Sequence, residues 1–251
     1  FQRKIVHEME DCALRQEYGD RLKQQLFCRV FFNEAISRER RSTAQVLKCY
    51  SAACDEKAEF RRPPFTDAVF PRVFDDAINV EAKARNIDPD LVRGLIKQES
   101  AYIVTAVSTS NALGLMQMIP PTAKDIAQSL KLGALELPKD LFDPKRNIKM
   151  GTFYLGQMLT KYQGHVPLAL AAYNAGPARM DRWVRSRPSL KNLALSRSST
   201  PENEIWIDEI PYNETSLYVK AILRNLLLYK LLGEGRVELP DPVWIAKADH
   251  K

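Results

Sequence analysis

Glu99 is the residue of this chain whose position most favours catalysis by proton transfer. Leu91, Val92, Leu95 and Ile96 recur at the spacing of one helix face, and a further step of four from Leu95 reaches Glu99. A carboxyl group that continues an apolar face is partly desolvated, which disfavours its charged form and raises its pKa toward neutrality. We therefore expect a general acid here. The same spacing leaves an alternative, in which the helix ends directly after Glu99 and its carboxylate simply reaches water.

Four ordered motifs begin at Glu99. They are Glu99-Ser100 with Ala106, Ser108 and Ala112-Leu113-Gly114-Leu115-Met116-Gln117; Leu141-Phe142-Asp143-Pro144 with Asn147-Ile148, Gly151 and Tyr154-Leu155; Ala172-Tyr173-Asn174-Ala175-Gly176-Pro177 with Arg179 and Trp183; and Ile210-Pro211-Tyr212-Asn213-Glu214-Thr215 with Tyr218-Val219-Lys220. Their order resembles that of the soluble lytic transglycosylases, a family with the fold of goose-type lysozyme. The resemblance covers roughly residues 70 to 232, and the segment before it matches no family that we can name.

The resemblance implies a peptidoglycan-cleaving enzyme in which Glu99 is both acid and base. Glu99 would protonate the glycosidic oxygen and then take the proton of the C6 hydroxyl of the same sugar, leaving a 1,6-anhydromuramic acid end. Ordinary glycosidases use two carboxylates, and no second acid stands beside Glu99 in the first motif. In this family the N-acetyl group of the substrate supplies the internal nucleophile. The residues that would line the glycan groove are Ser108, Gln117, Tyr173, Asn174, Glu214 and Tyr218.

Each groove residue also has a structural alternative. Tyr173 and Tyr218 lie on helices where aromatic side chains are usually part of the core, and Glu214 could be no more than a favourable charge at a helix N-terminus. The order of the motifs favours the functional interpretation. A different set of residues is expected to serve turns or close helix packing: Gly114, Gly151 and Gly176.

Two positions depart from the family pattern. Asn111 stands where the family usually has glycine, and because Asn tolerates a left-handed backbone, the turn is expected to survive. Met118-Ile119 reverses the usual Ile-Met order, which is expected to alter a sugar contact without affecting the acid.

Helix-start signals place these motifs on helices. Asp88-Pro89 and Asp143-Pro144 each put a capping carboxylate before a first-turn proline. The segment 103–114, rich in Ser, Thr and Val, is expected to form a loop or a small hairpin. The predicted helices span residues 89–100, 144–162 and 214–232, with a shorter one before Gly176. We predict an all-α fold, or α with a very small β-hairpin: a lysozyme-like helical catalytic domain with an N-terminal helical extension.

A helix-breaking run, Arg61-Arg62-Pro63-Pro64-Phe65, marks the predicted domain boundary. It separates an N-terminal helical accessory segment, residues 1–65, from a catalytic domain over 69–235 and a C-terminal tail over 236–251. The accessory segment is expected to pack on the catalytic domain and is a candidate for contacting a partner protein.

Four cysteines lie in the accessory segment: Cys12, Cys28, Cys49 and Cys54. Their spacing does not match a zinc site, and an even number confined to one segment favours two disulfides formed in an oxidising compartment. Four buried free thiols are the alternative, and three pairings stay open.

Composition restricts the class of protein. The chain has 251 residues, 45% hydrophobic and 27% charged, and contains no apolar run long enough to span a membrane. Its net charge of +6 favours an anionic polymer, but the densest basic run, Arg38 to Arg41, contains an acid and is interpreted as a solvated helix face rather than a nucleic-acid site. We expect a monomeric protein, periplasmic or associated with the outer membrane, that acts on glycan strands and needs no cofactor or metal.

Two rival functions remain. A hydrolytic lysozyme of goose-type fold would use water in place of the sugar hydroxyl, and a non-catalytic scaffold would keep the groove without the chemistry. The presence of Glu99 argues against the scaffold. Serine-hydrolase, zinc-protease and phosphate-loop motifs do not occur, and the three histidines lie far apart in the sequence.

Overall fold

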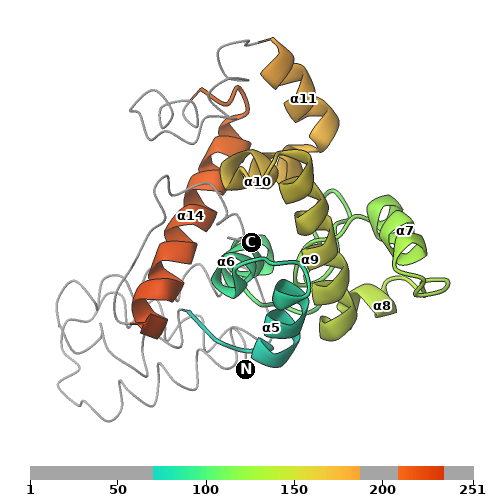
Figure 1. The fold of residues 1–251 in the computed structure, drawn as a ribbon. Helices are drawn as coiled ribbons and strands as arrows, with labels where there is room; N and C mark the ends of the chain where they lie inside the picture. Colours follow the sequence, from blue (N-terminus) through green and yellow to red (C-terminus); the bar gives the residue numbers. More distant parts are fainter. Residues whose placement is uncertain (1–69, 187–208, 235–251) are drawn as a thin grey trace, which may run out of the picture.

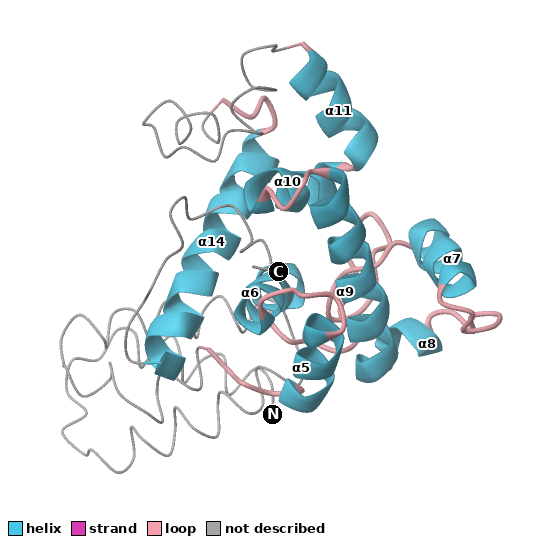
Figure 2. Ribbon diagram, in the orientation of Figure 1, coloured by secondary structure: helices cyan, strands magenta, loops and turns pink. Residues whose placement is uncertain are grey.

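The computed structural model describes residues 70–186 and 209–234 (Figure 1). Within these ranges the chain is helical, and its only bridges are isolated ones, Val107 with Leu113 and Leu113 with Met118 (Figure 2). The all-α prediction is confirmed, and the segment 103–114 is a loop. The accessory segment 1–65, its four cysteines and the tail 236–251 lie outside the described residues. The helices are α5 (Asp75–Lys83), α6 (Pro89–Ser100), α7 (Pro120–Ser129), α8 (Lys139–Phe142), α9 (Pro144–Lys161), α10 (Val166–Ala175), α11 (Pro177–Arg185) and α14 (Asn213–Glu234).

The two Asp-Pro signals start helices as predicted. The Asp88 carboxylate accepts a hydrogen bond of 2.9 Å from the Asp90 amide at the start of α6. Asp143 accepts one of 2.7 Å from the Arg146 amide at the start of α9. In both helices the proline occupies the first turn, where a missing N–H costs nothing.

Besides the four-residue α8, three helices had no sequence prediction: α5, α7 and α11. They are short, and each buries only two or three residues, so their apolar periodicity is weak. None of them has a side-chain N-cap. Both local signals that identify a helix in a sequence are therefore faint in these three segments.

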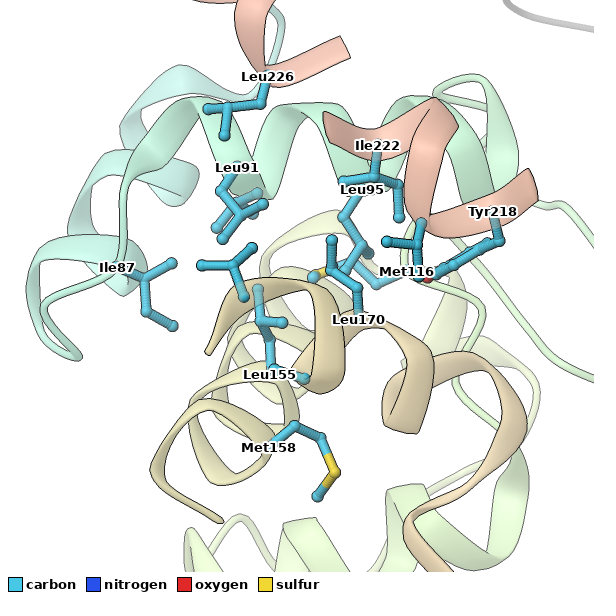
Figure 3. Packing of buried hydrophobic residues seen from close by; sticks show 14 of the residues in the cluster. Ile87, Leu91, Leu95, Met116, Leu155, Met158, Leu170, Tyr218, Ile222 and Leu226 are labelled. Atoms are coloured by element: carbon cyan, nitrogen blue, oxygen red, sulfur yellow. The ribbon is translucent and has the colours of Figure 1, made fainter. Parts of the chain in front are cut away.

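Helix α6 is at the centre of the core and packs mainly against α14. At their crossing, a Cβ added to Gly94 would lie 3.2 Å from the Leu226 nitrogen and 3.3 Å from the Ile222 oxygen, so a larger residue would push the two backbones apart by a few tenths of an ångström. Figure 3 shows Leu95 and Ile222 among the buried side chains of this region. The apolar residues predicted for α6 are all buried: Leu91, Val92, Leu95 and Ile96.

A buried arginine ties α5 to α6. Arg93 is 4% exposed and forms ion pairs with Asp75 at 2.8 Å and Asp90 at 2.7 Å. A third hydrogen bond, 2.9 Å long, runs from the guanidinium to the Asn79 side chain. A buried charge is tolerated when it is paired and hydrogen-bonded, as Arg93 is.

A second, smaller core lies beneath α7 and α8 on one side of α9. It is formed by Leu113, Met118, Ala123, Ile126, Ala127, Leu141 and Met150. Tyr154 and Tyr173 pack against both cores, so they connect the two halves of the domain. In the described ranges no helix is both long and apolar enough to cross a membrane.

Two glycines of α9 make a matched pair. A Cβ at Gly151 would overlap Met116, with 2.6 Å to its Cβ, whereas a Cβ at Gly156 would meet its nearest neighbour, Arg85, at an ordinary 3.5 Å. We expect Gly151→Ala to lower the free energy of unfolding by about 1–3 kcal/mol through overpacking. We expect Gly156→Ala to be neutral or to stabilise by up to about 1 kcal/mol through helix propensity. Urea unfolding of both variants measures this, and equal effects would contradict the packing assigned to Gly151.

His165 caps α10 and makes the stability of the fold depend on pH. Its buried Nδ1 accepts from the Leu168 amide at 3.3 Å, and burial lowers its pKa from 6.5 to about 4. Between these values the unfolded chain binds more protons than the folded one, so stability is lost as the pH falls below 6.5. From pH 7 to 5 we expect His165 to contribute a loss on the order of 1–2 kcal/mol. His165→Asn, which can cap but cannot titrate, should show a correspondingly smaller loss in urea unfolding, and an unchanged pH dependence would contradict this role.

Candidate active site

Glu99 lies in the last turn of α6. The helix ends at Ser100, because Ala101 adopts a left-handed backbone with φ 49°. Glu99 is nevertheless not simply directed to water, since its Oε1 accepts a hydrogen bond of 2.5 Å from the Tyr218 hydroxyl on α14. The carboxylate is half-buried between two helices that are distant in sequence.

Two tyrosines flank Glu99 and stay protonated. Burial, and after it the negative charge of Glu99, raises the pKa of both Tyr173 and Tyr218 well above the usual value. Tyr218 is 5% exposed, and its hydroxyl donates a hydrogen bond to Glu99. Tyr173 donates to the Met116 carbonyl at 2.8 Å. Each phenol is therefore a hydrogen-bond donor beside the carboxylate, never a second anion, in the neutral pH range.

The loop between α6 and α7 forms a further part of the site. Asn111 has φ 57° and Gly114 φ 77°, which confirms that the chain turns here as predicted. A Cβ at Gly114 would overlap the Leu141 carbonyl and the Asn147 side chain. The Ser108 hydroxyl accepts from the amides of Ser110 at 3.2 Å and Ala112 at 3.0 Å, so in this structure it stabilises the turn.

Gln117 is buried in a strained loop conformation, with φ 48°. Its Nε2 donates to the carbonyls of Gly114 at 2.9 Å and Ala106 at 3.2 Å. Its Oε1 is buried and has no hydrogen-bond partner among the described residues. A buried acceptor without a donor is costly, and such atoms are often completed by a ligand or an ordered water.

Asn174 and Glu214 lie where α10 ends and α14 begins. The Asn174 Oδ1 accepts a hydrogen bond of 2.7 Å from the hydroxyl of Thr215, which is 3% exposed. This bond joins the two helices that carry Tyr173 and Tyr218. Glu214 is exposed in the first turn of α14, four residues before Tyr218 and on the same face.

The structure brings Glu99, Tyr173 and Tyr218 together, with Gln117 next to the Met116 carbonyl that Tyr173 binds. Ser108, Asn174 and Glu214 occupy the flanking loop and helix ends. Sequence reasoning assigned no role to Asn147, Tyr154 or Thr215, although all three belong to the quoted motifs. A buried asparagine on the apolar face of α9 was the available signal for the first of them.

Within residues 70–186 and 209–234, the site offers proton transfer by one carboxyl group, that of Glu99. Residues 100–124 and 166–180, which include the loop after α6 and helix α10, contain no Asp or Glu, and residues 210–220 contain only the exposed Glu214. The described residues hold no cluster of His, Cys, Asp and Glu that could bind a metal ion. A single half-buried acid with phenol donors can protonate a leaving oxygen and can afterwards accept a proton.

Tyr173 and Tyr154 allow a test of the hydroxyl that holds the loop. Their rings pack with centroids 5.1 Å apart, and the Tyr173 hydroxyl binds the Met116 carbonyl. We expect Tyr173→Phe to lower the free energy of unfolding by about 1–2 kcal/mol, because a buried carbonyl loses its donor. Tyr154→Phe keeps the ring contact and is the control, expected to cost less than about 0.5 kcal/mol. Equal losses for the two variants in urea unfolding would contradict a special role of the Tyr173 hydroxyl.

Comparison with known proteins identifies a domain and its relatives. The family description "Transglycosylase SLT domain" matches residues 76–195. A putative soluble lytic murein transglycosylase of Haemophilus influenzae is 35% identical over 162 residues, and soluble lytic murein transglycosylase of Escherichia coli K12 is 29% identical over 176. The matches cover 64% and 70% of this chain but only 26% of each relative, so the chain spans about a quarter of their length.

A solved structure agrees with these matches. It is an inactive mutant of lytic transglycosylase Slt from Pseudomonas aeruginosa, 26% identical, with a TM-score of 0.65 over 91% of this chain and 32% of that one. The 70 kDa soluble lytic transglycosylase of Escherichia coli, 22% identical with a TM-score of 0.66, shares the fold. Residues 76–195 of this chain therefore resemble the transglycosylase SLT domain in sequence, and the fold agrees with that match.

Proposed function

We propose that the chain is a peptidoglycan lytic transglycosylase, which cleaves the β-1,4 bond between N-acetylmuramic acid and N-acetylglucosamine with Glu99 as its one acid and base. The observation that carries the proposal is the hydrogen bond from Tyr218 to Glu99, at 2.5 Å, in surroundings where the described residues contribute phenols rather than a second buried carboxylate. The matched relatives are named for this reaction on murein.

In the first step, the protonated Glu99 gives its proton to the glycosidic oxygen. The bond from this oxygen to C1 of the muramic acid breaks, and the N-acetyl oxygen of the same sugar attacks C1 from the opposite face. The Tyr218 hydrogen bond stabilises the carboxylate that forms on Glu99.

In the second step, the Glu99 carboxylate removes the proton of the C6 hydroxyl. The C6 oxygen then displaces the N-acetyl oxygen at C1 and closes a 1,6-anhydro ring. Glu99 ends the cycle protonated, and no water is consumed. Microscopic reversibility permits one residue to act as acid and then as base, and this is why a site without a paired carboxylate suffices.

Gln117, Tyr173 and Asn174 are proposed to orient the sugars by hydrogen bonds, together with Ser108 and Glu214 at the edges of the groove. The buried Gln117 Oε1 without a donor among the described residues supports this, since an amide N–H of an N-acetyl group would complete it. The proposal includes export, because peptidoglycan lies outside the cytoplasmic membrane. An accessory segment over residues 1–65, with its four cysteines paired in two disulfides, stays a prediction of the same proposal.

Digestion of purified peptidoglycan tests the function. Glu99→Gln keeps the shape of the side chain but has no proton to transfer, so we expect a loss of about 10²–10⁴-fold in the rate of glycan release. Glu136→Gln, which changes an exposed carboxylate paired with Lys139, is the control and should keep the full rate. Mass spectrometry of the released muropeptides identifies their ends.

Three outcomes separate the candidate functions. Anhydro ends from the wild type and the control, with none from Glu99→Gln, support the transglycosylase. Reducing ends identify a lysozyme-like hydrolase that uses the same acid with water. If the wild type binds the sacculus but releases nothing, the scaffold function replaces the proposal.

A further inference from the structure

Asn147 is a fully buried amide that binds both the loop bordering the site and the end of α8. It lies in the second turn of α9 and has no exposed surface. Its Nδ2 donates to the Leu113 carbonyl at 3.0 Å and to the Leu141 carbonyl at 2.8 Å. Its Oδ1 accepts from the Met116 amide at 2.7 Å. One side chain thus replaces the backbone partners that an irregular loop lacks.

The Met116 peptide units are held from two sides. The amide of Met116 is bound by Asn147, and its carbonyl is bound by the Tyr173 hydroxyl at 2.8 Å. Gln117 follows directly, with its side chain bonded back to Gly114 in the same loop. The loop therefore cannot shift on Asn147 without moving the partner of Tyr173 and the position of Gln117.

Tyr173 in turn interacts electrostatically with Glu99. Tyr173 packs against the same core as Tyr218, which binds Glu99, and the charge of Glu99 is among the causes that raise the pKa of the Tyr173 phenol. A continuous series of contacts therefore runs from the amide of Asn147, through the Met116 backbone, to the tyrosine beside the acid.

We propose that Asn147 is a positioning residue of the active site: through the Met116 backbone it sets where the Tyr173 hydroxyl and Gln117 lie relative to Glu99. The inference rests on the proposed function and extends it to a side chain that does not touch substrate. The close approach at Gly114 supports it, because a Cβ there would collide with Asn147 itself. The backbone of the loop and the Asn147 side chain are therefore closely packed against each other.

The test is a double-mutant cycle on glycan cleavage. Asn147→Asp keeps the shape and the acceptor for the Met116 amide but removes both donors, and Tyr173→Phe removes the other hold on the loop. We expect each single change to lower kcat by at least about tenfold. If Asn147 acts through Tyr173, the kcat of the double variant should lie within about twofold of the kcat of Tyr173→Phe alone.

A matched control separates positioning from general loss of packing. Thr152 is also fully buried on α9, and its hydroxyl donates to the Met116 sulfur at 3.8 Å rather than to the Met116 backbone. Thr152→Val should leave kcat within about twofold and combine additively with Tyr173→Phe. The inference is overturned if the kcat losses of Asn147→Asp and Tyr173→Phe add up in the double variant, or if Asn147→Asp leaves kcat unchanged.

Folding and function are controlled separately. Circular dichroism confirms that each variant is folded at the assay temperature, and if Asn147→Asp is not, Asn147→Ser, whose hydroxyl can keep one hydrogen bond, takes its place in the cycle. If the wild type releases no muropeptides, the proposed function fails, and the position of Tyr173 is then followed by the ¹³C NMR chemical shift of its Cζ atom. A chemical shift that changes in the Asn147 variant and not in Thr152→Val supports the coupling of Asn147 to Tyr173. An unchanged chemical shift in the Asn147 variant contradicts that coupling.

Discussion

The close contact between α6 and α14 is the constraint on which the rest of the domain depends. Three side chains on one face of α14 hold α6 and the turn after it at successive levels: Tyr218 binds Glu99, Asn225 binds the Gly94 carbonyl at 3.3 Å, and Tyr229 binds Tyr102 at 2.9 Å. Their spacing of seven and four residues is that of a single helix stripe. The absence of a side chain at Gly94 allows the backbones to approach until all three bonds form.

This packing also explains how a carboxylate is kept partly buried at acceptable cost. An ionised carboxylate withdrawn from water needs hydrogen bonds to replace its hydration. Tyr218 supplies one from a phenol that burial and the neighbouring charge keep protonated. The acid is thus stabilised by a neutral donor, which leaves it able to gain and lose a proton, whereas a buried lysine or arginine partner would hold it as an anion.

The loop between α6 and α7 is held by side chains rather than by regular backbone pairing. Between α6 and α7 the chain makes tight turns at positive φ, and its backbone groups cannot pair in a regular ladder. Side chains from the rigid helices complete them: Asn147 from α9 and the Tyr173 hydroxyl from α10. A loop supported in this way can present Gln117 with little freedom, which is what a glycan-binding surface requires.

The sequence by itself determined the features with local causes. Asp88 and Asp143 started their helices because a cap acts on amides two or three residues away, and the apolar stripe of α6 identified its buried face. The order of motifs indicated the family and Glu99. Only the tertiary structure decided that Glu99 is bound by Tyr218, which lies 119 residues further along the chain. The same is true of the loop at Met116, which is supported by Asn147, 31 residues further along the chain. The short helices α5, α7 and α11 likewise depend on packing more than on caps or periodicity. Contacts between distant segments arise when apolar faces pack, and no local spacing encodes which side chains then meet.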